Sequence, residues 1–171
     1  MHLRHILIAE DDPRDLELTL AALEEYNMAN KVFVVCNGEE ALDYLYCRGK
    51  YQARPGGNPV AVLLDLKMPK VNGIEVLKIL KADEHLKTIP IVVLTSSREE
   101  PDLRECYKHG VNAYVVKPVD FTEFMNAVKQ MGVFWVAVNE PPPNTGNGHP
   151  FTPAMKEATH EIPTSHSALG G

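Results

Sequence analysis

Five short runs of aliphatic and β-branched residues recur along the chain, each separated from the next by a segment in which apolar residues follow helical spacing. The runs are Ile6–Ala9, Val32–Val35, Val60–Leu64, Ile91–Leu94 and Ala113–Val116. Short continuous apolar runs predict strands buried on both faces of a sheet, and such strands pair in parallel when helices connect them. The sequence therefore predicts an α/β fold with a doubly wound, five-stranded parallel sheet.

Helix start signals support this alternation. Three segments place a capping side chain three residues ahead of a glutamate, which is the capping-box pattern. These pairs are Asn72–Glu75, Ser97–Glu100 and Asp120–Glu123. The pattern predicts that a helix begins at each of them.

Charge and cysteine usage exclude several classes of protein. The chain carries 17 Lys and Arg against 23 Asp and Glu, a formal charge of −6, which disfavours nucleic acid or anionic lipid as the main partner. No apolar run approaches the roughly 20 residues that span a bilayer, and the N-terminus lacks the pattern of a signal peptide. Three cysteines, an odd number within apolar segments, indicate reduced core residues. We therefore expect a cytoplasmic protein without a membrane partner.

The C-terminal part of the sequence departs from the alternating pattern. We expect a core domain over residues 1–131, an apolar extension of the fifth predicted helix over 132–140, and a Pro- and Gly-rich tail or arm over 141–171. The extension would expose Phe134 and Trp135, and exposed aromatic patches usually mark an interface. The expectation is a homodimer formed through the fifth helix and these two residues. The alternative is that the segment folds back and seals its own domain.

Polar residues gather at four strand ends, where an open parallel sheet binds ligands. The ends carry Glu10-Asp11-Asp12, Asp65, Thr95-Ser96-Ser97 and Lys117-Pro118. Converging carboxylates repel one another, so a divalent cation is the natural neutraliser, and oxygen ligands suit Mg²⁺. A phosphoryl group beside the metal would find the Lys117 ammonium and the Thr95 hydroxyl. Asp65 is then the candidate nucleophile for an aspartyl phosphate.

Together the segments around these ends resemble the receiver domain of two-component response regulators. The resemblance covers about residues 3 to 131 and is carried by Ile6–Pro13, Leu63–Gly73, Ile91–Ser97 and Ala113–Pro118. It implies the CheY-like strand order 2-1-3-4-5. It also implies a phosphoacceptor with only intrinsic autophosphorylation and autodephosphorylation, rather than an enzyme.

The same resemblance implies roles for individual residues. Asp65 is the implied phosphoacceptor, and the implied Mg²⁺ ligands are Glu10, Asp11, Asp65 and the backbone carbonyl of Lys67. Thr95 and Lys117 are expected to contact the phosphoryl group, and Thr95 and Tyr114 to act as a switch. A cis Lys117–Pro118 peptide bond is implied as well. From its position, the Lys67 side chain is expected to reach the phosphoryl group or Glu10 and to change the lifetime of the phosphorylated state.

A narrower resemblance concerns partners. The turn after the third strand, Lys81–Asp83 followed by Ile89-Pro90, and Phe134-Trp135 are similar to stand-alone regulators paired with bacterial and cyanobacterial phytochrome histidine kinases. It implies a sensor histidine kinase, and more narrowly a bacteriophytochrome, as the phosphoryl donor. We expect output by protein contact, because the sequence after residue 131 lacks the length and basic character of a DNA-binding module.

Other functions remain open at this point. The chain is alternatively a phosphorelay intermediate that passes the phosphoryl group to a histidine phosphotransfer protein, or a phosphate sink. An aspartyl-phosphate phosphatase would normally carry an acid two residues after its nucleophile, where Lys67 stands. A receiver-like binding module that is never phosphorylated would not need the complete set of acidic residues, Thr95 and Lys117.

Overall fold

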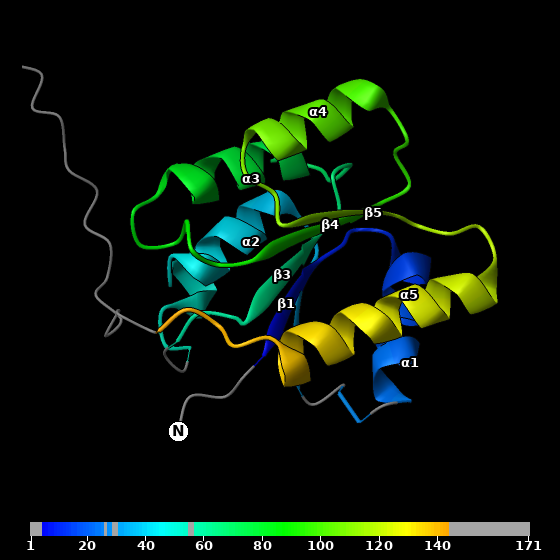
Figure 1. Cartoon of the computed structure of the whole chain (residues 1–171). Coiled ribbons are helices and arrows are strands. Elements are labelled where there is room, and N and C mark those ends of the chain that lie inside the picture. Colours follow the sequence, from blue (N-terminus) through cyan, green and yellow to red (C-terminus); the bar gives the residue numbers. More distant parts are fainter. Residues whose placement is uncertain (1–4, 26, 29–30, 55–56, 144–171) are drawn as a thin grey trace, which may run out of the picture.

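The computed structural model describes residues 5–25, 27–28, 31–54 and 57–143. Within this part, all strands belong to one parallel sheet in the order β2-β1-β3-β4-β5 (Figure 1). The strands are β1 (Ile6–Ala9), β2 (Val32–Val35), β3 (Ala61–Leu64), β4 (Ile91–Thr95) and β5 (Ala113–Val116). The predicted fold, strand order and strand positions are confirmed, with boundaries shifted by at most one residue.

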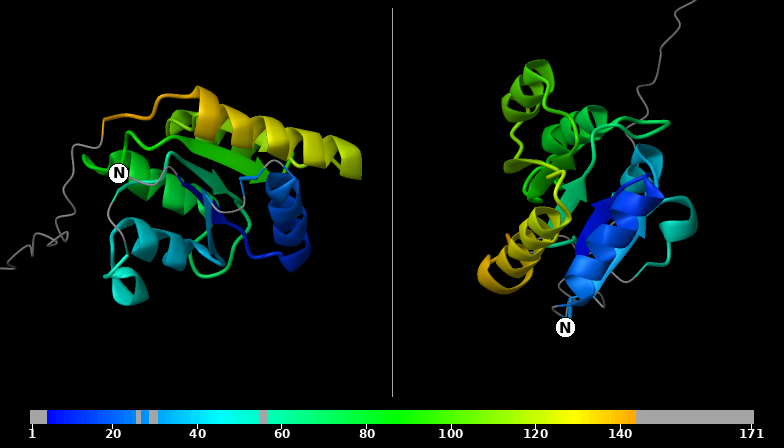
Figure 2. Two further views of the ribbon diagram at one scale, coloured as in Figure 1. Left: turned by 90° about the horizontal axis from the view of Figure 1, so that it is seen from below. Right: turned by 90° about the vertical axis from the view of Figure 1, so that its right-hand side faces the viewer.

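Helices cover both faces of the sheet. They are α1 (Pro13–Glu24), α2 (Gly38–Leu45), α3 (Gly73–Ala82), α4 (Glu100–Lys108) and α5 (Phe121–Val133), with a short 3₁₀ turn η2 (Gly49–Tyr51) and a π-helical turn η3 (Phe134–Val138). The helices α1 and α5 pack side by side on one face, and α2, α3 and α4 lie on the other (Figures 1 and 2). None of the described helices is long and apolar enough to cross a membrane.

Two apolar cores follow from the alternation of strand side chains. Leu7, Val62 and Ile91 face the side of α2 and α3, and Ile8, Leu63 and Val92 face the side of α1 and α5. The central strands β1, β3 and β4 are buried on both faces, as predicted. The prediction is wrong for β2 and β5, because these strands lie at the edges of the sheet, where fewer neighbours cover them.

Two of the three predicted helix starts are confirmed, each with the expected N-cap residue. The side chains of Asn72 and Asp120 accept the backbone N–H of Glu75 and Glu123, at 3.0 and 2.9 Å. The prediction for Ser97 is wrong. The helix begins later, at Glu100, and the Ser97 hydroxyl instead donates to the Asp102 carboxylate at 2.6 Å.

The three cysteines are free, but the prediction that they are core residues holds for only one of them. Cys106 is buried, Cys47 is half-buried and Cys36 is exposed. Cys36 follows directly after edge strand β2, so no helix covers it. Its apolar sequence context does not reveal this position.

The C-terminal extension is neither fully exposed nor fully sealed. The helix α5 continues directly into η3, in which Val136 is buried while Phe134 is 47% exposed. Trp135 is half-buried and packs against the core shared by α1 and α5. Phe134 is therefore exposed as expected, whereas Trp135 partly covers its own domain. The expected domain boundaries stay a prediction, and residues 144–171 of the predicted tail lie outside the described residues.

Candidate phosphoacceptor site

The carboxyl ends of β1 and β3 bring the acidic residues together. These strands pair in register, with Ala9 opposite Leu64, so Glu10 and Asp65 are the next residues on neighbouring strands. The backbone N–H of Asp65 donates to the Ala9 carbonyl at 3.0 Å and fixes this arrangement. One carboxylate oxygen from each of Glu10, Asp11 and Asp65 lies within 4.8 Å of the other two. The predicted convergence of these three residues is confirmed.

This acidic cluster has the chemistry that a divalent cation requires. Glu10 and Asp65 are buried and Asp11 is exposed, which leaves one side open to solvent. Burial raises the pKa of Glu10, and the nearby Lys117 opposes that rise. Hard oxygen donors around an open side suit Mg²⁺, which keeps several of its water ligands. The residues present therefore fit a bound divalent metal ion.

Lys117 is the cation of the site and follows β5 directly. Its ammonium donates to Glu10 Oε2 at 2.6 Å and to Asp15 Oδ2 at 2.7 Å, and it lies 3.9 Å from Asp65 Oδ1. Its hydrogen bonds to the two carboxylates raise its pKa and outweigh the effect of burial. Sequence reasoning found Lys117 and Glu10 but missed Asp15, because a charged residue in the first turn of a helix is ordinarily a surface residue.

The Lys117–Pro118 peptide bond is trans, so the expected cis bond is wrong for this structure. The trans form is the intrinsically favoured one, by about 0.5–1 kcal/mol. The contacts of Lys117 with Glu10 and Asp15 are present together with this trans bond.

Asp65 is held in place by the turn that follows it. Its Oδ1 atom accepts the backbone N–H of Leu66 at 2.9 Å. Gly73, the first residue of α3, packs so closely that a Cβ atom there would lie 2.1 Å from the Asp65 carbonyl oxygen. The glycine therefore permits the close approach of α3 to the end of β3.

The two predicted switch residues meet at Ser97. Thr95 is fully buried, and its hydroxyl accepts the Ser97 N–H at 3.3 Å. The Tyr114 hydroxyl donates to the Ser97 carbonyl oxygen at 3.1 Å. Burial raises the pKa of Tyr114. The backbone of Ser97 therefore links Thr95 to Tyr114 through two hydrogen bonds.

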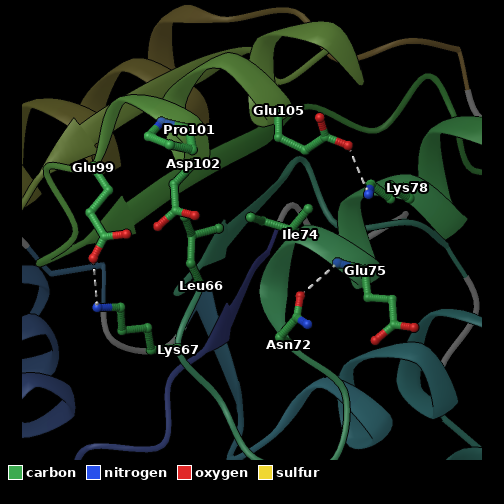
Figure 3. Close-up of a pocket in the computed structure, with 10 residues that line it drawn as sticks. All are labelled: Leu66, Lys67, Asn72, Ile74, Glu75, Lys78, Glu99, Pro101, Asp102 and Glu105. Atoms are coloured by element: carbon green, nitrogen blue, oxygen red, sulfur yellow. Dashed lines mark hydrogen bonds and ion pairs between the residues drawn. The ribbon is translucent and has the colours of Figure 1, made fainter.

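Lys67 lies beside the site but is paired with a residue other than the expected Glu10. Its ammonium lies 3.8 Å from Glu99 Oε1, and both side chains are largely exposed (Figure 3). It pairs across to the start of α4 rather than with Glu10.

A groove of about 820 Å³ lies beside the site, between α3 and α4. Figure 3 shows its two walls joined by the Lys67–Glu99 and Lys78–Glu105 ion pairs. The sequence analysis did not identify this groove, because its walls come from two helices whose spacing is set by tertiary packing.

Residues 6–129 match the family model of the response regulator receiver domain. The solved bacteriophytochrome response regulator AtBRR is 58% identical, with 82% of this chain and 100% of that chain covered and a TM-score of 0.66. The phosphorylated cyanobacterial phytochrome response regulator RcpA is 35% identical, covering 82% and 99%, with a TM-score of 0.76.

A third relative, response regulator Rcp1 of Synechocystis, is 34% identical over 77% of this chain and 88% of its own length. Its solved Mn²⁺-bound form covers 81% of this chain and 99% of that one, with a TM-score of 0.75.

Proposed function

Because this chain belongs to the response regulator receiver domain family, we propose that it accepts a phosphoryl group from a histidine kinase on Asp65. The family serves as phosphoacceptors and signalling modules, and phytochrome response regulators are among its relatives. The observation that carries the proposal is the position of Asp65, buried between two carboxylates that fit a metal ion and the Lys117 ammonium.

The arrangement supplies what phosphoryl transfer needs. An Asp65 carboxylate oxygen attacks the phosphorus atom of a phosphohistidine, a P–O bond forms, and the P–N bond to the histidine breaks. Receiver domains bind a divalent metal at their acidic pocket, and Glu10, Asp11, Asp65 and the Lys67 carbonyl are the proposed ligands here. Such an ion, when bound, neutralises charge on the phosphoryl oxygens. Lys117 and the Thr95 hydroxyl supply further donors to those oxygens.

Intact mass after incubation with acetyl phosphate and Mg²⁺ tests the phosphoacceptor. We expect an adduct of about 80 Da, the mass of one phosphoryl group, that is absent from Asp65→Asn. The matched control Asp43→Asn, in α2 and away from the site, should retain it. An adduct that persists in Asp65→Asn contradicts the proposal.

Signalling then follows from a population shift. Phosphoryl contacts with Thr95 and Lys117 favour one arrangement of β4, its following loop and Tyr114, and only this differential contact energy moves the equilibrium. Lys67 is proposed to change the lifetime of the phosphorylated state through its position beside the site. Equal decay rates for wild type and Lys67→Asn would refute that role.

The kinase partner is proposed from the relatives. AtBRR and RcpA are regulators of bacteriophytochrome and phytochrome systems, and a bacteriophytochrome histidine kinase is the proposed donor for this chain. Purified phosphorylated kinases should differ in transfer rate, with a bacteriophytochrome kinase the fastest. A faster transfer from an unrelated sensor kinase contradicts the assignment.

The exposed part of the extension is proposed to bind a second copy of the chain. Phe134 lies edge-on against Trp135, with ring centres 4.9 Å apart, and Val138 is 64% exposed beside them. Light scattering at about 10 µM should show a dimer. The double variant Phe134→Asp/Val138→Asp should be a monomer, because it places charge in the interface but leaves Trp135 on the core. The exposed Tyr107→Asp on α4 should remain a dimer, and a monomeric wild type contradicts the proposal.

A further inference from the structure

Lys117 has a partner that the proposed reaction does not use. Asp15, the third residue of α1, accepts a hydrogen bond from the Lys117 ammonium at 2.7 Å. The Lys117 side chain is 7% exposed and that of Asp15 is 35% exposed, so the pair is shielded on one side only. This contact joins the first turn of α1 to the end of β5.

Two of the donors of the ammonium are engaged by carboxylates in this arrangement. An ammonium has three N–H donors. Glu10 and Asp15 accept at 2.6 and 2.7 Å, whereas the nearer Asp65 oxygen, at 3.9 Å, lies outside hydrogen-bond range. The strongest contacts of Lys117 are therefore with two carboxylates that are not the phosphoacceptor.

The position of Asp15 is well determined. The N-cap residue Asp12 accepts the backbone N–H groups of Arg14 and Asp15, at 2.8 and 3.1 Å. The Thr19 hydroxyl donates to the Asp15 carbonyl oxygen at 2.7 Å. Because its backbone is held at both its N–H and its carbonyl, Asp15 is fixed at the start of α1, from where its carboxylate reaches Lys117.

Resting on the proposed phosphorylation of Asp65, we propose that Asp15 is a positioning residue that competes with the phosphoryl oxygens for the Lys117 ammonium. A phosphoryl group on Asp65 attracts the Lys117 ammonium, which now lies 3.9 Å from Asp65 Oδ1, and the movement toward it weakens the pair with Asp15. Once the third donor is used, any further donor given to the phosphoryl oxygens is taken from Glu10 or Asp15. The Asp15 carboxylate also repels an incoming phosphoryl donor. Both effects favour the unphosphorylated state, so Asp15 restrains phosphorylation.

The test compares initial rates of modification by acetyl phosphate and Mg²⁺. We expect Asp15→Asn to be phosphorylated about fivefold faster than wild type, mainly through a lower half-saturating acetyl phosphate concentration. The conservative Asp15→Glu should return the rate toward the wild-type value. The control Glu17→Gln removes the same charge from an exposed position on α1 and should change the rate less than about twofold.

Salt distinguishes a direct contact from a general charge effect. At about 0.5 M NaCl, exposed charges are screened, so a Glu17→Gln effect should disappear while the Asp15→Asn effect persists. Thermal unfolding confirms that each variant is folded. An Asp15→Asn rate equal to or below that of wild type, or one abolished by salt, overturns the positioning role. A wild type that gives no adduct overturns the proposed function first, and the positioning role with it.

Discussion

The helices α3 and α4 form the two walls of the same groove, and they are attached to the domain in different ways (Figure 3). In α3, the residues Gly73, Val76, Leu77 and Leu80 are buried. Every residue of α4 is described, and Cys106 alone is buried. The apolar core therefore holds α3 and scarcely reaches α4.

The first turn of α3 is likewise held by a side-chain cap that the first turn of α4 lacks. Asn72 caps α3 through its side chain, whereas Glu99, at the start of α4, makes no capping hydrogen bond with its side chain. Polar contacts anchor α4 instead: Ser97 with Asp102, and Lys78 with Glu105 at 2.8 Å. The Lys78–Glu105 ion pair is partly exposed and contributes little stability, whereas the Ser97 hydroxyl is buried.

The two helices also contact different parts of the site. The first residue of α3 packs against the backbone of Asp65, so α3 supports the proposed phosphoacceptor. The helix α4 follows the loop where Thr95 and Tyr114 meet at Ser97. Local stability varies across a structure, and the elements that move belong to its weakly held end. The structure thus combines a firmly held support for Asp65, the proposed phosphoacceptor, with a weakly held α4.

The largest difference is expected from truncating one leucine in each helix. Leu77 is fully buried and Leu103 is 38% exposed. Leu77→Ala should lower the free energy of unfolding by about 3 kcal/mol, because it leaves a cavity, and Leu103→Ala by less than about 1 kcal/mol. Urea unfolding measures both, and equal losses would remove the contrast between the helices.

Glycine substitutions sharpen the comparison at the site itself. Gly73→Ala forces a Cβ against the Asp65 carbonyl oxygen and should cost about 2–3 kcal/mol and slow the modification of Asp65. Gly110, just beyond α4, has φ of +79° and open space around it, so Gly110→Ala should cost only about 1 kcal/mol of backbone strain. Urea unfolding measures the loss of stability, and the initial rate of modification by acetyl phosphate measures the effect on Asp65. A Gly73→Ala variant that is modified at the wild-type rate argues against a rigid support for Asp65.

Capping residues provide a smaller test. Asn72→Ala removes a side-chain bond to the Glu75 N–H and should cost about 1 kcal/mol. Glu99→Ala removes no capping bond and only a long, exposed ion pair with Lys67, so it should cost less than about 0.5 kcal/mol. A larger loss for Glu99→Ala in thermal unfolding would show that α4 is anchored more firmly than its contacts indicate.

The smallest effect concerns the ionic anchor of α4. Lys78, and then His109, lower the pKa of Glu105 to about 2, below its ordinary value of 4.5. A depressed carboxyl pKa adds stability above pH 4.5 that is lost as the pH falls toward 2. Glu105→Gln should therefore be less stable than wild type at pH 6, with the difference shrinking by pH 3. The exposed Glu75→Gln on α3 is the control, and a constant difference for Glu105→Gln contradicts the anchor.

Local patterns in the sequence predicted much of the fold and site. Apolar runs located the strands. Parallel pairing then placed Glu10, Asp65, Thr95 and Lys117 together at the carboxyl ends of the strands. This inference succeeds because strand ends follow from residues adjacent in the chain, and because the topology of the sheet brings those ends together.

Contacts between distant elements decided the rest. The pairing of Asp15 with Lys117 joins residues 102 positions apart, and nothing near Asp15 distinguishes it from an ordinary acid in a first helical turn. The exposed position of Cys36 and the polar role of Ser97 likewise depend on which elements lie beside them.

The sequence by itself determined the α/β architecture and the four strand ends that carry the chemistry, because periodicity and strand termini are local properties of the chain. Only the tertiary structure decided which carboxylates share Lys117 and how loosely α4 is held. Those features depend on distances between side chains that only the packed sheet and helices bring together.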